Sequence, residues 1–99
     1  MKRPAIFHPE AEEEFLAAIA YYAGRSVRTS ERFEAEIRRL VASIETMPRR
    51  HGLWRHGTRR ARARHFRYLV IFAERPTSLL IVAVAHTRQR PEYWLQRLD

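Results

Sequence analysis

The chain has 99 residues, of which 45% are hydrophobic and 30% are charged, and this composition predicts one globular domain spanning residues 1–99. It contains no cysteine, which excludes disulfide bonds, thiol catalysis and thiolate metal sites. No apolar run approaches the roughly 18 residues that cross a bilayer, so we expect no membrane partner and a cytoplasmic location.

The charge is distributed unevenly along the chain. The formal net charge is +8, yet residues 1–48 hold seven basic and eight acidic side chains, whereas residues 49–99 hold twelve basic and three acidic ones. No acid occurs between Glu45 and Glu74, a stretch that contains eight arginines. Such a charge suits a polyanionic partner, of which nucleic acid, an acidic protein surface and an anionic membrane are the three classes; of these, a membrane is not expected.

The first quarter of the chain predicts an edge strand and then a helix. Residues 2–7 form the strand, and Pro4 restricts it to the edge of a sheet. Pro9 suits the first position of a helix, glutamates follow it in the first turns, and Gly24 predicts the helix end. Apolar residues at spacings of three and four form one stripe: Ala11, Phe15, Ala18, Ile19 and Tyr22.

A second helix is expected to begin at Ser26 or Ser30, which are both suitable N-caps, and to end before Pro48. Because the link between the helices is short, we expect an antiparallel hairpin. The hairpin should pack on a sheet through one set of apolar side chains: Phe15, Ile19, Tyr22, Phe33, Ile37, Leu40 and Ile44.

Three strands are expected after a loop at residues 49–58. In residues 59–64, alternation places Arg60, Arg62 and Arg64 on one face of a strand, and Ala61 and Ala63 on the other. Residues 66–73 and 79–85 are mostly apolar; the second segment is apolar on both faces and should be a central strand covered by the helices.

The predicted fold class follows from this order of elements. It is α+β, with an N-terminal strand, an α-helical hairpin, and then a three-stranded, mostly antiparallel sheet. A short C-terminal helix is expected to open at Pro91.

The catalytic chemistry open to the chain is narrow. Its glycines form no phosphate-binding loop and its histidines form no metal-binding pair, so we expect no cofactor and no metal. A metal-independent option is RNA cleavage by the RNA's own 2′-hydroxyl, in which arginines stabilise the developing charge and a tyrosine or histidine moves protons. The candidates for these roles are Arg60, Arg62, Arg64, Arg88 and Arg90 for charge, and His65, Tyr68, His86 and Tyr93 for proton transfer.

Several motifs resemble the RelE/ParE superfamily of type II toxins. They are His8-Pro9-x-Ala11, the pair Tyr21-Tyr22, and above all the ending Ala85-His86-x-Arg88-x-Arg90-Pro91-x-Tyr93-Trp94. The resemblance covers almost the whole chain. It implies the RelE/ParE-like fold, and a toxin that a cognate acidic antitoxin neutralises in a hetero-oligomer, as in plasmid-stabilisation systems.

The superfamily has two main activities. Its RelE-like branch cuts messenger RNA on the ribosome, and the residues that match that activity here are Arg60, Arg62, Arg88 and Tyr93. However, Leu69 stands where that branch has an arginine, and Trp94 stands where it has a tyrosine. The resemblance therefore favours the ParE-like branch, which poisons DNA gyrase and needs no catalytic residue.

Three hypotheses about function follow. The favoured one is a non-enzymatic gyrase poison; the alternatives are a ribosome-dependent mRNA endoribonuclease and a plain nucleic-acid-binding module. The last would use Trp54, Phe66 or Tyr68 to stack bases, although Phe66 and Tyr68 also fit a hydrophobic core. The residues expected to bind the antitoxin or the target are Arg60, Arg62, Arg64, Arg88, Arg90, Tyr93 and Trp94.

Overall fold

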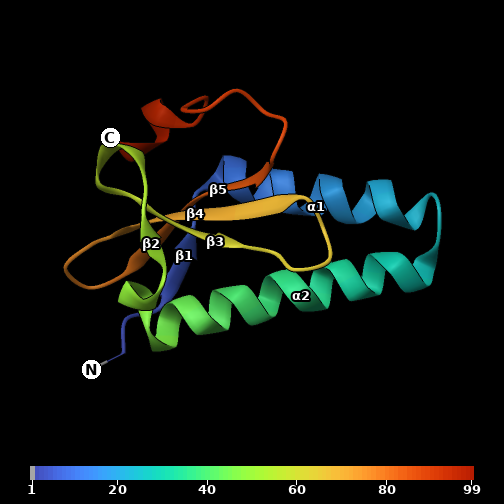
Figure 1. Ribbon diagram of the computed structural model, residues 1–99, viewed down its shortest axis with the longest axis horizontal. Coiled ribbons are helices and arrows are strands. Elements are labelled where there is room, and N and C mark those ends of the chain that lie inside the picture. Colours follow the sequence, from blue (N-terminus) through green and yellow to red (C-terminus); the bar gives the residue numbers. More distant parts are fainter. Residues whose placement is uncertain (1) are drawn as a thin grey trace.

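The computed structural model describes residues 2–99 and shows a helical hairpin packed on one face of a five-stranded sheet (Figure 1). The elements are β1 (Ala5–Phe7), α1 (Pro9–Ala23), α2 (Val27–Thr46), β2 (Gly52–Leu53), β3 (Arg59–Arg62), β4 (Tyr68–Glu74) and β5 (Leu79–His86). Short 3₁₀ helices occupy Pro48–Arg50, Arg55–Gly57 and Leu95–Leu98. The predicted α+β class is confirmed.

Local capping signals begin and end both long helices. The Nδ1 atom of His8 accepts a hydrogen bond from the Glu10 amide at 3.1 Å, and Gly24 is the C-cap of α1. Ser26 is the N-cap of α2, and its hydroxyl accepts a hydrogen bond from the Thr29 amide at 3.2 Å. The two N-caps satisfy backbone donors that the first turn of a helix leaves free, and the Gly24 amide donates to the Ala20 carbonyl in the last turn of α1 at 3.1 Å.

The sheet has the strand order β1-β5-β4-β3-β2. β1 pairs parallel to β5, and the other neighbours pair antiparallel. The expected three-stranded sheet is therefore wrong in its strand number. β1 joins one edge, as Pro4 predicts, and β2, which lies in a segment expected to be a loop, pairs with β3 and forms the other edge.

The central position of β5 is confirmed, but the helices cover only one of its faces. On that face the buried cluster includes Phe15, Phe33, Ile37 and Ile44, with Ile19, Tyr22 and Leu40 packed against it. A bulge leaves Val82 without a partner on β4, so that Val82 and Ala83 both belong to the cluster on the opposite face. There Trp94 from the C-terminal segment covers the sheet instead of a helix.

Two further boundaries differ from the prediction. β3 ends at Arg62 rather than residue 64: the Ala63 amide still donates to the Tyr68 carbonyl at 3.0 Å, but the amides of Arg64 and His65 donate to the carboxylate of Glu36 on α2 instead of to β4. The expected terminal helix does not open at Pro91, since Glu92 adopts a φ of 70°, which a helix does not allow. Within residues 2–99, no helix is both long and apolar enough to cross a membrane.

Candidate functional site

A pocket of about 210 Å³ opens on the sheet face opposite the helices. Its floor includes Leu69, Ile71 and Ala85, which are apolar. Five of the seven predicted binding residues line it: Arg60, Arg62, Arg90, Tyr93 and Trp94. We call this site the arginine pocket; Arg64 and Arg88 lie outside its lining.

Trp54 and Arg60 form one wall of the arginine pocket. The Cζ atom of Arg60 lies 3.8 Å from the centroid of the Trp54 ring, and that of Arg55 lies 5.1 Å from the same centroid. Cation–π stacking holds the Arg60 guanidinium over the ring face. Its N–H edges remain available to a planar anion such as a carboxylate or phosphate.

A carboxylate clasp joins the Trp54 loop to the C-terminal segment. Glu92 contacts Nε2 of His56, and its other oxygen lies 3.4 Å from Nη1 of Arg55. The His56 hydrogen bond, and then the charges of His56 and Arg55, hold the pKa of Glu92 below its usual range. The contacts of Glu92 therefore hold together the Trp54 loop and the C-terminal segment, which both line the arginine pocket.

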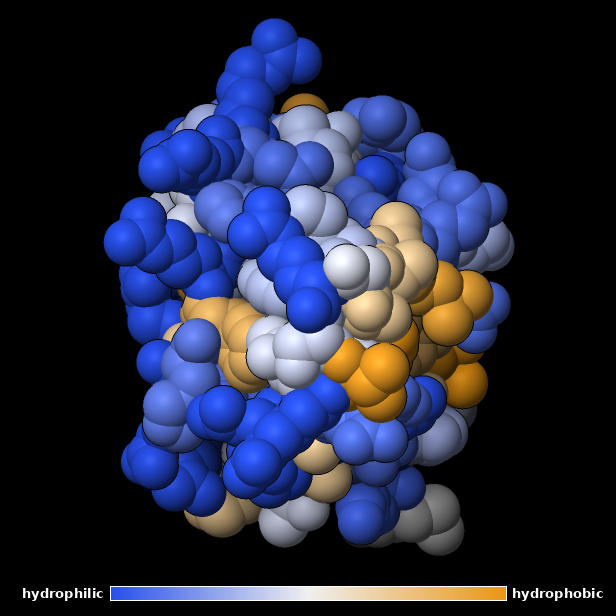
Figure 2. Space-filling view, turned by 90° about the vertical axis from the view of Figure 1, so that its right-hand side faces the viewer, coloured by the Kyte–Doolittle hydropathy of each residue, from blue (hydrophilic) through white to orange (hydrophobic). Residues whose placement is uncertain are grey.

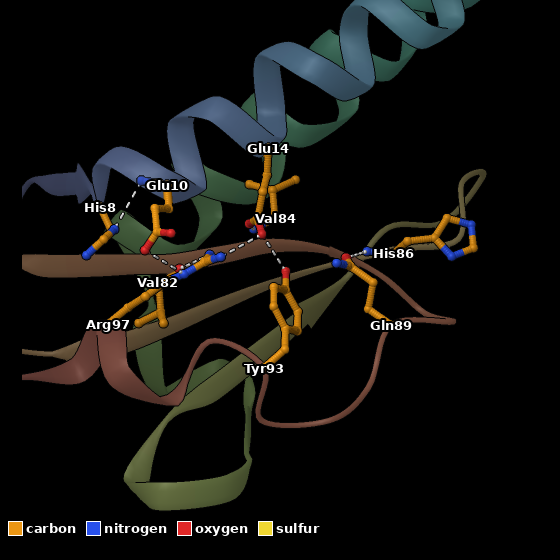
Figure 3. Close-up of polar contacts among 9 residues, drawn as sticks. All are labelled: His8, Glu10, Glu14, Val82, Val84, His86, Gln89, Tyr93 and Arg97. Carbon is orange, nitrogen blue, oxygen red and sulfur yellow. Dashed lines mark hydrogen bonds and ion pairs between the residues drawn. The ribbon is translucent and has the colours of Figure 1, made fainter.

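A second carboxylate, on α1, holds the C-terminal segment against β5 (Figure 3). One oxygen of Glu14 accepts hydrogen bonds from the Tyr93 hydroxyl at 2.7 Å and from Nη2 of Arg97 at 3.0 Å. The other oxygen accepts the Val84 amide at 3.0 Å. Arg97 also donates to the Val82 carbonyl at 3.1 Å, next to the bulge of β5.

This network gives Tyr93 and Trp94 structural roles. Burial and the hydrogen bond to Glu14 raise the pKa of Tyr93, so its hydroxyl remains protonated and engaged. Trp94 is only 1% exposed, which leaves its indole closed to a partner in this conformation. The sequence alone predicts no contact between Glu14 and Arg97. A signal for Glu14 was present, because it lies on the same helical face as Ala11 and Ala18.

The other predicted binding residues lie beside turns. Arg64 follows β3 and is exposed, while Ala61 and Ala63 are buried as the alternation predicts. Arg88 follows β5, and its amide donates to Nδ1 of His86 at 3.0 Å. This assigns the proton of a neutral His86 ring to Nε2.

Carboxylates neutralise some arginines and leave others free. Glu74 has Arg3 at 2.7 Å, Arg59 at 3.4 Å and Arg49 at 3.5 Å, and the Arg3 hydrogen bond is the main cause that lowers its pKa. Within residues 2–99, several arginines form no ion pair with a carboxylate, and Arg25, Arg28, Arg32, Arg50 and Arg75 are among them. The unpaired arginines on β3, at the turn after it and in the segment after β5 are Arg60, Arg62, Arg64, Arg67, Arg88 and Arg90.

These observations define what the site can do. The arginine pocket combines unpaired guanidinium groups with an apolar, aromatic lining, and such a surface binds anionic groups that carry apolar neighbours. Among the described residues, no three His, Asp or Glu side chains are arranged to hold a metal ion.

Comparison with known proteins gives one result that bears on identity. The model of a family described as "ParE toxin of type II toxin-antitoxin system, parDE" matches residues 5–91, which include both layers of the fold and most of the arginine pocket. No match is found among curated proteins. The family match confirms the predicted resemblance, including its ParE-like branch, and implies an antitoxin partner. The chain belongs to the ParE toxin family of type II toxin–antitoxin systems.

Proposed function

We propose that this toxin arrests growth by trapping DNA gyrase on cleaved DNA, without catalysing a reaction of its own. Membership of the ParE family supports the toxin role. The observation that carries the proposal is the arginine pocket, where Arg60, Arg62 and Arg90 surround an apolar floor and have no carboxylate partner within residues 2–99. A surface of this kind is suited to bind a protein rather than to break a bond.

The pocket is poorly equipped for proton transfer. Arginine remains protonated at neutral pH and cannot act as a base. The Tyr93 hydroxyl donates to Glu14, and its raised pKa keeps it from becoming a base. Leu69 occupies the floor where a RelE-like nuclease would have an arginine.

His86 is the observation that favours the second candidate, a ribosome-dependent mRNA endoribonuclease. Its ring lines the same pocket as Arg60 and Arg62. With Nδ1 occupied by the Arg88 amide, Nε2 would have to carry the proton transfer. The arginines would then stabilise the charge of the phosphorane.

We also propose how the antitoxin neutralises the toxin. Carboxylates of an acidic antitoxin segment pair with Arg60 and Arg62, while its apolar side chains cover Leu69 and Ile71. Occupancy of the arginine pocket then keeps the target away. Because gyrase acts on DNA in the cytoplasm, toxin, antitoxin and target share that compartment.

One pair of assays separates the two candidate functions. With purified gyrase and plasmid, the toxin should accumulate cleaved DNA complexes, and it should leave translation on purified ribosomes intact. His86→Gln and Tyr93→Phe, each shown to be folded, should keep growth inhibition nearly unchanged, whereas Arg60→Ala with Arg62→Ala should lose it. Ribosome-dependent mRNA cutting that disappears in His86→Gln would contradict the gyrase proposal and establish the nuclease.

A further inference from the structure

A second crevice, of about 480 Å³, lies at the turn between β3 and β4. The crevice is lined by this turn and by Thr87, the residue that follows β5. The Thr87 amide donates a hydrogen bond to the Arg67 carbonyl at 2.9 Å, which links the two segments. Its basic lining comes from Arg62, Arg64 and Arg67, with His65 between them. Among the residues that the structure describes, no carboxylate lines this crevice.

The backbone of the turn is fixed from two sides. Glu36 on α2 accepts hydrogen bonds from the amides of Arg64 and His65, and from Nδ1 of His65 at 2.8 Å. The ring of Phe66 packs edge-on against Phe33, with centroids 5.2 Å apart. The arginines on either side of these anchors are thus exposed on a fixed backbone, which lowers the entropy cost of binding a ligand.

Glu36 does not neutralise these arginines. Its side chain is 7% exposed, and the basic side chains beside it are the His65 ring and, at 4.0 Å, Arg39. Although burial alone would raise its pKa, the hydrogen bonds from His65 and the Arg64 amide hold the pKa of Glu36 below its usual range. The guanidinium groups of Arg64 and Arg67 therefore remain without an acidic partner within residues 2–99.

We infer that this crevice binds the phosphate backbone of double-stranded DNA. Guanidinium groups bind phosphate oxygens in pairs, and such contacts are independent of base sequence. Single-stranded nucleic acid is favoured by exposed aromatic rings that stack bases. The aromatic ring at this crevice, Phe66, is instead packed into the core against Tyr22 and Phe33.

The surface around the crevice agrees with this assignment. Figure 2 shows this end of the molecule, where hydrophilic side chains cover most of the face and hydrophobic ones gather on one side. The large exposed apolar side chains of the helical hairpin are Leu16, Tyr21 and Val27. The crevice and the arginine pocket share Arg62 and Thr87, but Arg64 and Arg67 line the crevice and not the arginine pocket. Contact with DNA through these two arginines would add to gyrase poisoning but does not depend on it.

The test measures binding of the whole toxin to a short labelled DNA duplex of arbitrary sequence, without gyrase, across a salt series. We expect Arg64→Ala combined with Arg67→Ala to weaken binding about tenfold or more at about 50 mM salt, and to reduce the slope of log K against log salt by about two. Duplex DNA should bind more tightly than single-stranded DNA or RNA of the same length.

The matched control is Arg49→Ala combined with Arg50→Ala, which removes the same charge just after the C-terminal end of α2, outside the lining of the crevice. This control should leave most of the affinity and the slope unchanged. Equal losses in both double variants would show a mere effect of net charge and overturn the proposal. So would tighter binding to a single strand, or binding to a poly-glutamate peptide but not to duplex DNA. Because gyrase is absent, these results leave the gyrase proposal to its own test.

Discussion

Two neighbouring arginines of β3 show how differently the sheet uses the same side chain. Arg59 is 17% exposed and lies 3.4 Å from Glu74, which also binds Arg3 and Arg49. Arg60 stacks on Trp54 and has no carboxylate partner within residues 2–99. The sequence assigns both to one basic cluster, but the structure separates them. Arg59 belongs with Arg3 and Arg49, which pair with Glu74 and which we call the neutralised group. Arg60 belongs to the arginines on β3, at the turn after it and in the segment after β5 that have no carboxylate partner within residues 2–99, which we call the free group: Arg60, Arg62, Arg64, Arg67, Arg88 and Arg90.

The comparison shows which positively charged side chains in the second half of the chain stabilise the fold and which do not. Ion pairs around Glu74 join the segment before β1 to β3 and β4 and therefore belong to the fold. Unpaired arginines close together repel one another and contribute no such links. Side chains that lower the stability of the fold without a compensating contact are expected mainly at functional sites. The free group is therefore expected to contact a partner.

The largest expected effect comes from removing a carboxylate from a buried arginine. Glu14→Ala leaves Arg97, whose side chain is 7% exposed, without its principal counter-charge and also frees the Tyr93 hydroxyl. We expect the free energy of unfolding to fall by about 3 kcal/mol, measured by urea denaturation. Glu14→Gln retains an acceptor and should cost less. A wild-type value for Glu14→Ala would show that the network does not hold the C-terminal segment.

Glu36 should show the next largest effect. Glu36→Ala leaves the amides of Arg64 and His65 without their acceptor and should lower the free energy of unfolding by about 2 kcal/mol. Because folding lowers the pKa of Glu36, its contribution exists above the unfolded pKa and is lost as pH falls through the folded pKa. Acid unfolding of wild type and Glu36→Ala should therefore converge at low pH; a constant difference down to about pH 2 would refute this role.

The neutralised group should respond weakly to the loss of its acid. Glu74→Gln removes the charge that faces Arg3, Arg49 and Arg59, but the side chain is 23% exposed and solvent screens these pairs. We expect a loss of about 1 kcal/mol or less, smaller still at high salt. Urea denaturation at two salt concentrations checks both statements, and a salt-independent loss would contradict the electrostatic cause.

The free group should contribute least to the fold. Arg60→Ala combined with Arg62→Ala removes no ion pair and loses only the stacking of Arg60 on Trp54, so the free energy of unfolding should fall by about 0.5 kcal/mol. Thermal and urea unfolding measure this directly. A loss as large as that of Glu14→Ala would show that these arginines stabilise the fold, and it would contradict the distinction between the two groups.

Much of the fold could be predicted from local signals. Pro9, Gly24 and Ser26 mark the helix ends, and the apolar run of β5 places it in the interior of the sheet, between β1 and β4. These features depend on neighbours in sequence or on simple periodicity. The two-residue strand β2 offers no such signal, because its pairing with β3 depends on the tertiary fold.

The site could be predicted only in part. The alternation in β3 correctly turned Ala61 inward, and Arg60 and Arg62 do line one pocket. The carboxylates that fix these segments lie far away in sequence: Glu14 is 83 residues from Arg97, whose side chain it binds, and Glu36 is 28 residues from Arg64, whose amide it accepts. Such contacts leave no periodic pattern, which is why Tyr93 was predicted at a surface and is found in a buried network.

The most direct test of the division between the two groups is antitoxin affinity across a salt series. Arg60→Ala combined with Arg62→Ala should weaken binding of the cognate antitoxin and flatten its salt dependence, because the lost contacts are charged. Arg49→Ala combined with Arg50→Ala removes equal charge outside the arginine pocket and should change the affinity little. Equal effects of the two double variants, or an unchanged affinity and slope for the first, would contradict the account.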